Sequence, residues 1–186
     1  MSSSIENIEK VLGAKRFGNR SAQIDWILTD SRSLCFPEET LFFALKTKRN
    51  DGHKYLSELY ERGVRNFVVG ELPVDLQSFQ DANFLQLINP LKGLQKLAEK
   101  HREQFQIPVI GITGSNGKTI VKEWLYQLLS PDRVVTRSPR SYNSQIGVPL
   151  SVWLMNEHTE LAIFEAGISE TVSYTHLRAH ETGAYL

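Results

Sequence analysis

The sequence has little of what marks an extracellular or membrane protein. Cys35 is its single cysteine among 186 residues, so no intramolecular disulfide can form. No apolar run approaches the roughly 20 residues that a membrane-spanning helix needs. Charged residues interrupt residues 1–17, which therefore lack the continuous apolar core of a signal peptide. We expect a cytoplasmic protein without membrane insertion.

The sequence also lacks an excess of either charge. Lysine plus arginine number 21, and so do aspartate plus glutamate. A net charge of zero gives no overall attraction to nucleic acid or to an anionic membrane, so we expect neither as a partner, and any anion site must be local. The hydrophobic content of 41% is typical of a globular protein, and the sequence has no internal repeat.

The first part of the sequence has the pattern of a small α/β domain. Leucines and tyrosines at helical spacing predict a helix over residues 53–63, with Gly63 at its end. Asn89 and Pro90 have the residue types of an N-cap and a first helical position, so they predict a closing helix that ends near Gln106. Short apolar runs bounded by turn residues predict strands at residues 24–29, 41–45, 66–70 and 84–88.

The second part of the sequence begins again with a strand. Apolar patterns predict a strand over residues 107–113, a helix over 119–129, and further strands at 133–137 and 160–167. This order is typical of the opening of a parallel nucleotide-binding sheet. The sequence therefore predicts two α/β domains with a boundary near Gln106.

A glycine-rich turn, TGSNGKT at residues 113–119, lies between the predicted strand and helix of the second part. Gly114 and Gly117 permit backbone angles that let successive N–H groups converge on phosphate oxygens at a helix N-terminus. In this arrangement Lys118 neutralises the β- and γ-phosphates, and the hydroxyl of Thr119 binds Mg²⁺. The order of elements and residues thus predicts a phosphate site.

The turn departs from the strict P-loop pattern in one respect. GxxxxGK[ST] would require glycine at Ile112, whereas the glycine here is Gly111, one residue earlier. A generic P-loop is therefore an inexact description. A glycine-rich connection with an incidental lysine stays open as the alternative.

Phosphoryl transfer also needs a carboxylate that holds metal, usually at the end of a neighbouring strand. Glu165 ends the apolar segment LAIFE and is the candidate. Taken alone, such a residue is more often a solvated strand end. Together with Lys118 and Thr119 it predicts a metal site, because ligands of parallel sheets bind at the carboxyl ends of the strands.

These motifs resemble a known family. TGSNGKT is similar to the ATP-binding signature of the Mur ligases, the ATP-dependent amide-forming enzymes of peptidoglycan synthesis, which show the same glycine spacing. KEWL (residues 122–125), YNSQIGVPLSV (142–152) and FEAGIS (164–169) resemble the type that joins D-alanyl-D-alanine to UDP-N-acetylmuramoyl-tripeptide. DSR and DGH, within residues 27–56, resemble signatures of its substrate domain.

The resemblance implies a reaction and roles for residues. ATP phosphorylates the terminal carboxylate of the tripeptide, and the amine of D-alanyl-D-alanine attacks the acyl phosphate. Lys118 and Glu165 are then catalytic, and Thr119 and Glu165 hold Mg²⁺. The implied ATP-binding residues are Thr113, Gly114, Ser115, Asn116, Gly117, Lys118 and Thr119. The implied substrate-binding residues are Ser31, Arg32, Asp51, Gly52, His53 and Asn143.

Other interpretations of these motifs stay open. DSR is also an ordinary turn, and DGH is an ordinary helix entry. The ligase that adds the third peptide residue shares DSR, DGH and the ATP signature, although IGVPL is not expected there. A binding module for UDP-muramoyl peptide without catalysis, and an unrelated P-loop kinase or transport ATPase, are further alternatives.

The resemblance ends near residue 169. Ligases of this family continue with more of the central sheet and a carboxy-terminal domain, whereas residues 171–186 resemble translated adapter sequence. We therefore predict a UDP-substrate domain at 1–106, a truncated ATP-binding domain at 107–170 and a non-native tail, in a fragment that lacks activity. The first domain also resembles ligases that are fused to an alanine racemase. The sequence predicts no oligomeric state.

Overall fold

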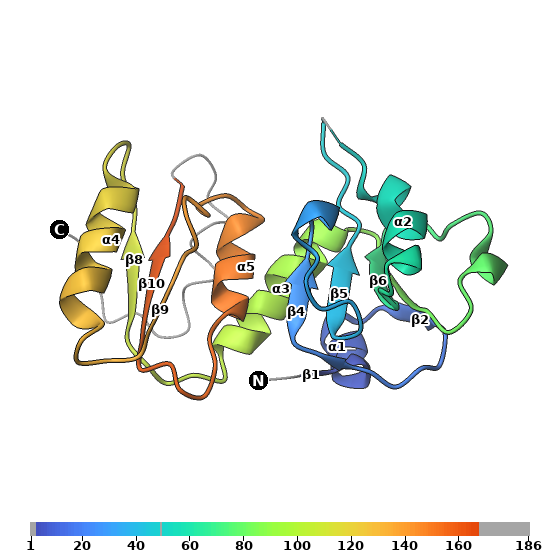
Figure 1. The fold of residues 1–186 in the computed structure, drawn as a ribbon, viewed down its shortest axis with the longest axis horizontal. Coiled ribbons are helices and arrows are strands. Elements are labelled where there is room, and N and C mark those ends of the chain that lie inside the picture. The colour runs from blue at the N-terminus through green and yellow to red at the C-terminus, as the bar shows by residue number, and fades with distance from the viewer. Residues whose placement is uncertain (1–2, 49, 168–186) are drawn as a thin grey trace. The chain divides into compact units, whose positions relative to one another are not determined.

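The computed structural model describes residues 3–48 and 50–167 (Figure 1). The chain divides into two compact units, Met1–Leu94 and Gln95–Leu186. Each unit contains its own β-sheet flanked by helices, so the predicted α/β class is confirmed. The predicted tail at residues 171–186 lies outside the described residues.

The first unit is built on a five-stranded sheet of order β2-β7-β6-β5-β4. Strands β4 to β7 run parallel to one another, whereas β2 pairs antiparallel with β7 and covers that edge. A separate antiparallel pair joins β1 and β3. The strands are β1 (Ser3–Ser4), β2 (Lys15–Phe17), β3 (Gln23–Ile24), β4 (Trp26–Leu28), β5 (Thr40–Phe43), β6 (Asn66–Val69) and β7 (Asn83–Gln86).

The strand predicted over residues 24–29 is divided in the structure. The N–H groups of Asp25 and Trp26 both donate to the carbonyl of Glu39, at 3.0 and 3.1 Å. Two successive donors on one acceptor break the regular ladder, as in a β-bulge. The segment therefore forms the end of β3 and the start of β4.

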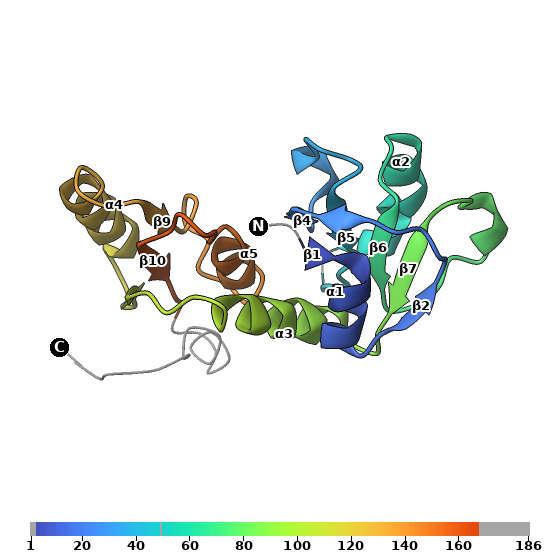
Figure 2. The same ribbon diagram turned by 90° about the horizontal axis from the view of Figure 1, so that it is seen from below.

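Helices cover both faces of this sheet (Figure 2). Phe42, Phe67 and Phe84, from three neighbouring strands, pack with Leu59 of α2, while α1 and the start of α3 lie on the opposite side. Gly63 ends the α2 region with φ of 97°, as its residue type predicts. The helical segments are α1 (Ile5–Leu12), η1 (Ser31–Ser33), η2 (Gly52–Tyr55), α2 (Leu56–Glu61), η3 (Leu76–Ser78) and α3 (Pro90–Arg102).

Helix α1 has clear local signals, although the sequence patterns above do not predict it. Ser4 accepts the N–H of Asn7 at 3.2 Å and caps the start of the helix. Gly13 ends it in the left-handed region, with φ of 65°. Ile5 and Ile8 are fully buried, so its apolar face packs into the first unit.

The second unit contains a parallel sheet of order β8-β10-β9, which confirms the predicted parallel arrangement. Figures 1 and 2 show α4 and α5 on opposite sides of this sheet. Ala162 and Phe164 of β10 pack with Val148 of α5, whereas Glu165 contacts α4. The elements are β8 (Val109–Ile112), α4 (Lys118–Leu129), β9 (Val135–Arg137), α5 (Gly147–Trp153) and β10 (Leu161–Glu165).

The division between the units falls inside α3, whereas the sequence predicts a boundary near Gln106. The carboxyl half of α3 belongs to the second unit because Ala98 lies in its apolar cluster. His101 also hydrogen-bonds the carbonyl of Met155 through Nε2, at 2.9 Å. In the part of the chain that the structure describes, no helix is long and apolar enough to cross a membrane.

Candidate functional site

The glycine-rich turn joins the end of β8 to the start of α4. Gly114 and Gly117 have φ values of 137° and 76°, in the region that favours glycine. A Cβ atom at Gly117 would meet nothing within 4 Å, so the backbone angle, and not crowding, requires glycine there. Because the N-cap of α4 is glycine, it has no side chain to accept the first-turn N–H groups. These donors suit an anion.

The structure brings three predicted site residues together beside this turn. Lys118 begins α4, and its Nζ donates to the carbonyl of Gly114 at 2.6 Å. The hydroxyl of Thr119 donates to Oε2 of Glu165 at 3.1 Å. Glu165 pairs with Ile112 in the sheet register, so its carboxylate lies beside the strand that enters the turn.

The donor set at this position fits Mg²⁺. A carboxylate and a hydroxyl are hard oxygen ligands, and the carboxylate of the fully buried Glu165 faces Thr119 through Oε2 and the Nζ of a buried lysine, Lys122, through Oε1. The described residues contain no cluster of three or more His, Cys, Asp or Glu side chains that suits a metal. A metal held by Thr119 and Glu165 would therefore need further oxygen ligands, as Mg²⁺ usually takes from phosphates and water.

The prediction of the site did not include Lys122, one helical turn beyond Thr119. Its side chain is fully buried, and its Nζ lies 3.0 Å from Oε1 of Glu165. The same Nζ donates to the carbonyl of Ser138 at 2.8 Å and to that of Arg140. The motif KEWL contains this lysine, but a lysine on a helix is ordinarily exposed, so the sequence alone gives it no role.

The DSR segment forms the short helix η1 after β4. Asp30 accepts the N–H of Arg32, and the two side chains form a paired contact with distances of 2.9 and 2.6 Å. Hydrogen bonds from this guanidinium hold the pKa of Asp30 below its usual value. Ser31 is buried, and its carbonyl accepts a hydrogen bond from Arg62. The segment is thus an ordered turn whose arginine is exposed.

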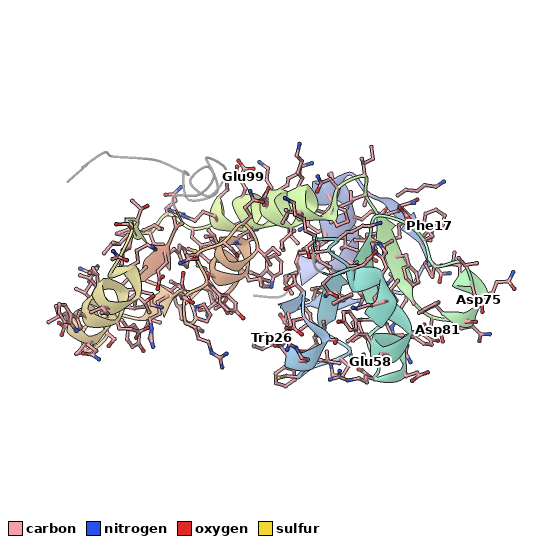
Figure 3. The ribbon with its side chains drawn as sticks, turned by 90° about the horizontal axis from the view of Figure 1, so that it is seen from above. Phe17, Trp26, Glu58, Asp75, Asp81 and Glu99 are labelled. Atoms are coloured by element: carbon pink, nitrogen blue, oxygen red, sulfur yellow. The ribbon has the colours of Figure 1, made fainter. Side chains whose placement is uncertain are left out.

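An aromatic pair lies near this turn. Trp26 of β4 and Phe36 stack with ring centroids 5.2 Å apart. Trp26 is 43% exposed, and Figure 3 shows it at the surface of the first unit.

The DGH segment opens η2 after β5. Asp51 accepts the N–H of His53 at 3.0 Å and contacts its Nδ1 at 2.7 Å, and these bonds, the backbone one first, lower the pKa of Asp51. Nε2 of His53 accepts the N–H of Gly70 at 3.1 Å, so Nδ1 carries the ring proton and donates to Asp51. Gly52 is required by close packing, because a Cβ there would lie 2.8 Å from the Cα of Ala44.

A pocket of about 390 Å³ lies beside this segment and wholly within the first unit. Asp51 and His53 line it together with Lys46, and the loop after β6 forms its other wall. The pocket therefore lies at the carboxyl ends of parallel strands, the usual ligand position in such sheets. Ser31 and Arg32 follow the neighbouring strand β4 and are not among its lining residues.

Asn143 belongs to the second unit, in the loop before α5. It is half-buried, and its carbonyl accepts the N–H of Gly167 at 2.8 Å. Gly167 follows the end of β10, so this loop lies beside the strand that carries Glu165. The structure thus places Asn143 in the second unit, beside the end of β10, whereas the UDP-site candidates Ser31, Arg32, Asp51, Gly52 and His53 belong to the first unit.

The second unit has the features of the class of P-loop-type α/β proteins: a strand, a glycine-rich turn and a helix in order, and a carboxylate at the end of the next strand in the sheet. A separate α/β domain precedes it in this chain. Within that class, the sequence model of the Mur ligase middle domain matches residues 112–181. The chain belongs to the Mur ligase family.

Relatives and solved structures agree with this assignment. The UDP-N-acetylmuramoyl-tripeptide–D-alanyl-D-alanine ligase of Bacillus subtilis is 36% identical over 146 residues, which are 78% of this chain and 31% of that protein. The structure of MurF from Acinetobacter baumannii is 26% identical, with a TM-score of 0.77, over 90% of this chain and 36% of that one. MurF ligase from Thermotoga maritima in complex with ADP is 30% identical, with a TM-score of 0.67, over 81% and 34%.

The matched regions of these proteins are short relative to their length. The chain spans about a third of the relatives that it matches, 31% of the Bacillus subtilis protein and 35% of the one from Borreliella burgdorferi. The match of the middle-domain model ends at residue 181, beyond the described residues and within the predicted tail.

Proposed function

We propose that the chain is the amino-terminal part of a ligase that uses ATP to add D-alanyl-D-alanine to UDP-N-acetylmuramoyl-tripeptide in peptidoglycan synthesis. The observation that carries the proposal is the hydroxyl of Thr119, 3.1 Å from the carboxylate of Glu165 and directly beyond the glycine-rich turn. The names of the relatives and the ADP complex of the Thermotoga maritima protein support these substrates. A cytoplasmic location is part of the proposal.

The second unit would bind the nucleotide. First-turn N–H groups of α4 bind phosphate oxygens, and Lys118 stabilises negative charge on the transferred phosphoryl group. Thr119 and Glu165 hold Mg²⁺, which supplies positive charge to the β- and γ-phosphates when it is bound. The tripeptide carboxylate becomes an acyl phosphate, and the amine of D-alanyl-D-alanine displaces phosphate from it. Asn143 contacts the bound substrates.

The first unit would bind the UDP end of the muramoyl peptide. Its pocket is the binding site in this proposal, and Asp51 and His53 shape the wall because each is already hydrogen-bonded within the unit. Gly52 allows the wall to pack against β5, and Ser31 and Arg32 contact the ligand from the neighbouring strand end.

The test is ADP release by the full-length protein that carries this chain. We expect release to require both UDP-muramoyl-tripeptide and D-alanyl-D-alanine. Lys118→Ala should lower kcat by about 10²- to 10³-fold, because a charge that develops in the transition state loses its partner. Lys100→Ala, which removes an exposed lysine paired with Glu103, is the matched control and should have no effect. ADP release with ATP alone, or equally with other amines, would contradict the proposal.

A binding module without catalysis is the second candidate, because the pocket lies wholly within the first unit. Calorimetric titration of the chain with UDP-muramoyl peptide separates this candidate from an inert fragment. The ligase for the third peptide residue is tested by supplying UDP-muramoyl-dipeptide with single amino acids in place of UDP-muramoyl-tripeptide with D-alanyl-D-alanine. The domain bounds, the non-native tail and the racemase fusion stay predictions, and genomic sequencing across codon 170 tests whether the tail is native.

A further inference from the structure

Lys122 is a buried ammonium to which the proposed reaction assigns no task. Its side chain and that of Glu165 are both fully buried, and Nζ lies 3.0 Å from Oε1. Nζ also lies 3.2 Å from a carboxylate oxygen of Glu123. A charge in the interior is costly unless it is paired, so this lysine is kept in place by the acceptors around it.

The same lysine connects two parts of the nucleotide site. It donates to the carbonyls of Ser138 and Arg140, at the start of the loop that leads to Asn143. The hydroxyl of Ser138 in turn accepts the backbone N–H of Glu165 at 3.1 Å. The end of β10, the loop and α4 are therefore held by one cluster, and the Glu165 carboxylate has a defined orientation toward Thr119.

The charges around Glu165 oppose a free dication. Lys122 contacts the carboxylates of both Glu165 and Glu123, Arg137 contacts that of Glu123, and Lys118 adds a third cation from the residue before Thr119. Cationic side chains thus outnumber carboxylates at the position where Mg²⁺ would bind. The phosphates of a nucleotide carry several negative charges and reverse this balance.

We propose that Lys122 is a positioning residue that aims Glu165 at Thr119 and makes metal binding at this carboxylate depend on a bound nucleotide. The inference rests on the proposed function, because it assumes that Thr119 and Glu165 hold the metal of a metal–nucleotide substrate. A residue that only filled space would affect stability, whereas this lysine also sets the order in which metal and nucleotide bind.

The experiment measures Mn²⁺ binding to the full-length protein by the electron paramagnetic resonance signal of free Mn²⁺, with and without ATP. The Mn²⁺ binding that is lost in Glu165→Gln is assigned to this site. In the wild-type protein we expect Mn²⁺ to bind at this site when ATP is present and not when ATP is absent. Lys122→Met keeps the aliphatic volume and removes a cation that lies 3.0 Å from the Glu165 carboxylate and repels a dication, so Mn²⁺ alone should bind about 10- to 100-fold more tightly than to the wild-type protein.

Two controls separate charge from packing. Lys122→Arg keeps the charge and should keep nucleotide-dependent binding, and Lys100→Met removes the lysine of an exposed ion pair in the same unit. The proposal is overturned if Lys122→Met binds Mn²⁺ alone no better than the wild-type protein, whatever its melting temperature. If Lys122→Met does not fold, Mn²⁺ binding is compared between the wild-type protein and Glu165→Gln, each with and without ATP. The inference is overturned if the binding that depends on Glu165 is equally tight without ATP.

The same data separate this inference from the proposed function. If Glu165→Gln leaves Mn²⁺ binding in the presence of ATP unchanged, the proposed metal site is wrong. If Glu165→Gln weakens that binding while Lys122→Met leaves the binding of Mn²⁺ alone unchanged, the metal site stands and the role of Lys122 is wrong.

Discussion

The two units differ in what their helices bury. In the first unit, β5 and β6 are buried at every residue, and apolar side chains of α1 and α2 are buried with them. In the second unit, β10 is buried at every residue, but Lys122 is the one buried residue of α4, all of which the structure describes. The exposed side chains of α4 include Ile120, Val121, Trp124 and Leu128.

The unit with the better-covered core is therefore not the unit that carries the candidate nucleotide site. The first unit has the ordinary construction of a stable domain, in which apolar faces of helices cover both sides of a sheet. In the second unit, polar contacts to Thr119 and Lys122 orient α4 on β10, while four of its apolar side chains, those of Ile120, Val121, Trp124 and Leu128, are exposed. The candidate nucleotide site is therefore attached to the less covered of the two units.

The largest expected effect is a difference in folding between the separated units. We expect residues 1–106 to unfold cooperatively as a monomer, because the first sheet and its core are complete within them. We expect residues 107–186 to aggregate, because within the described residues β8 and β9 each pair with β10 alone and the apolar side of α4 is exposed. Analytical ultracentrifugation and thermal melting check both, and a monomeric, cooperative 107–186 would contradict the comparison.

The next effect is the loss of a core aromatic ring in the first unit. Phe67 is fully buried, stacks on Phe84 at 5.1 Å and meets Phe42 and Phe79 edge to face. Phe67→Ala should lower the free energy of unfolding by about 3–5 kcal/mol, as measured by urea titration. Phe67→Leu keeps most of the volume and should cost less. A loss below about 1 kcal/mol for the alanine variant would show a core that collapses around the gap.

A smaller effect is a pH dependence that belongs to the second unit. Burial lowers the pKa of His101, which is neutral in the fold and donates from Nε2 to the carbonyl of Met155. The unfolded chain therefore takes up this proton first, and the stability of the folded state falls as the pH drops below about 6.5 toward the lower folded pKa. His101→Gln should flatten urea-unfolding stability between pH 7 and 5, while the exposed His158→Gln should not.

The smallest effect concerns the exposed side of α4. Trp124 is 63% exposed, so Trp124→Ser should change the free energy of unfolding by no more than about 0.5 kcal/mol. It should also raise solubility, because it removes apolar surface. The matched control is Trp153→Ser, since Trp153 is buried against the ring of His101 and its loss should destabilise the unit. A large loss of stability for Trp124→Ser would mean that this face is covered.

Much of the fold follows from local patterns. The strands at β6 and β7, the start of α3 at Asn89 and the end of the α2 region at Gly63 were predicted because apolar runs and caps act within a few residues. The break between β3 and β4 at Asp25 and the unit boundary inside α3 were not predicted, because both depend on contacts with distant segments. The break at Asp25 depends on the carbonyl of Glu39, and the boundary inside α3 depends on the apolar cluster of the second unit.

The sequence by itself determined the glycine-rich turn. Its backbone angles require glycine at fixed positions, and Lys118 and Thr119 follow these glycines directly in the chain. Only the tertiary structure decided what surrounds Glu165. Because β10 lies between β8 and β9, this carboxylate meets Thr119 and the buried Lys122. Strand order brings together residues that are far apart in the chain, and no local pattern specifies it.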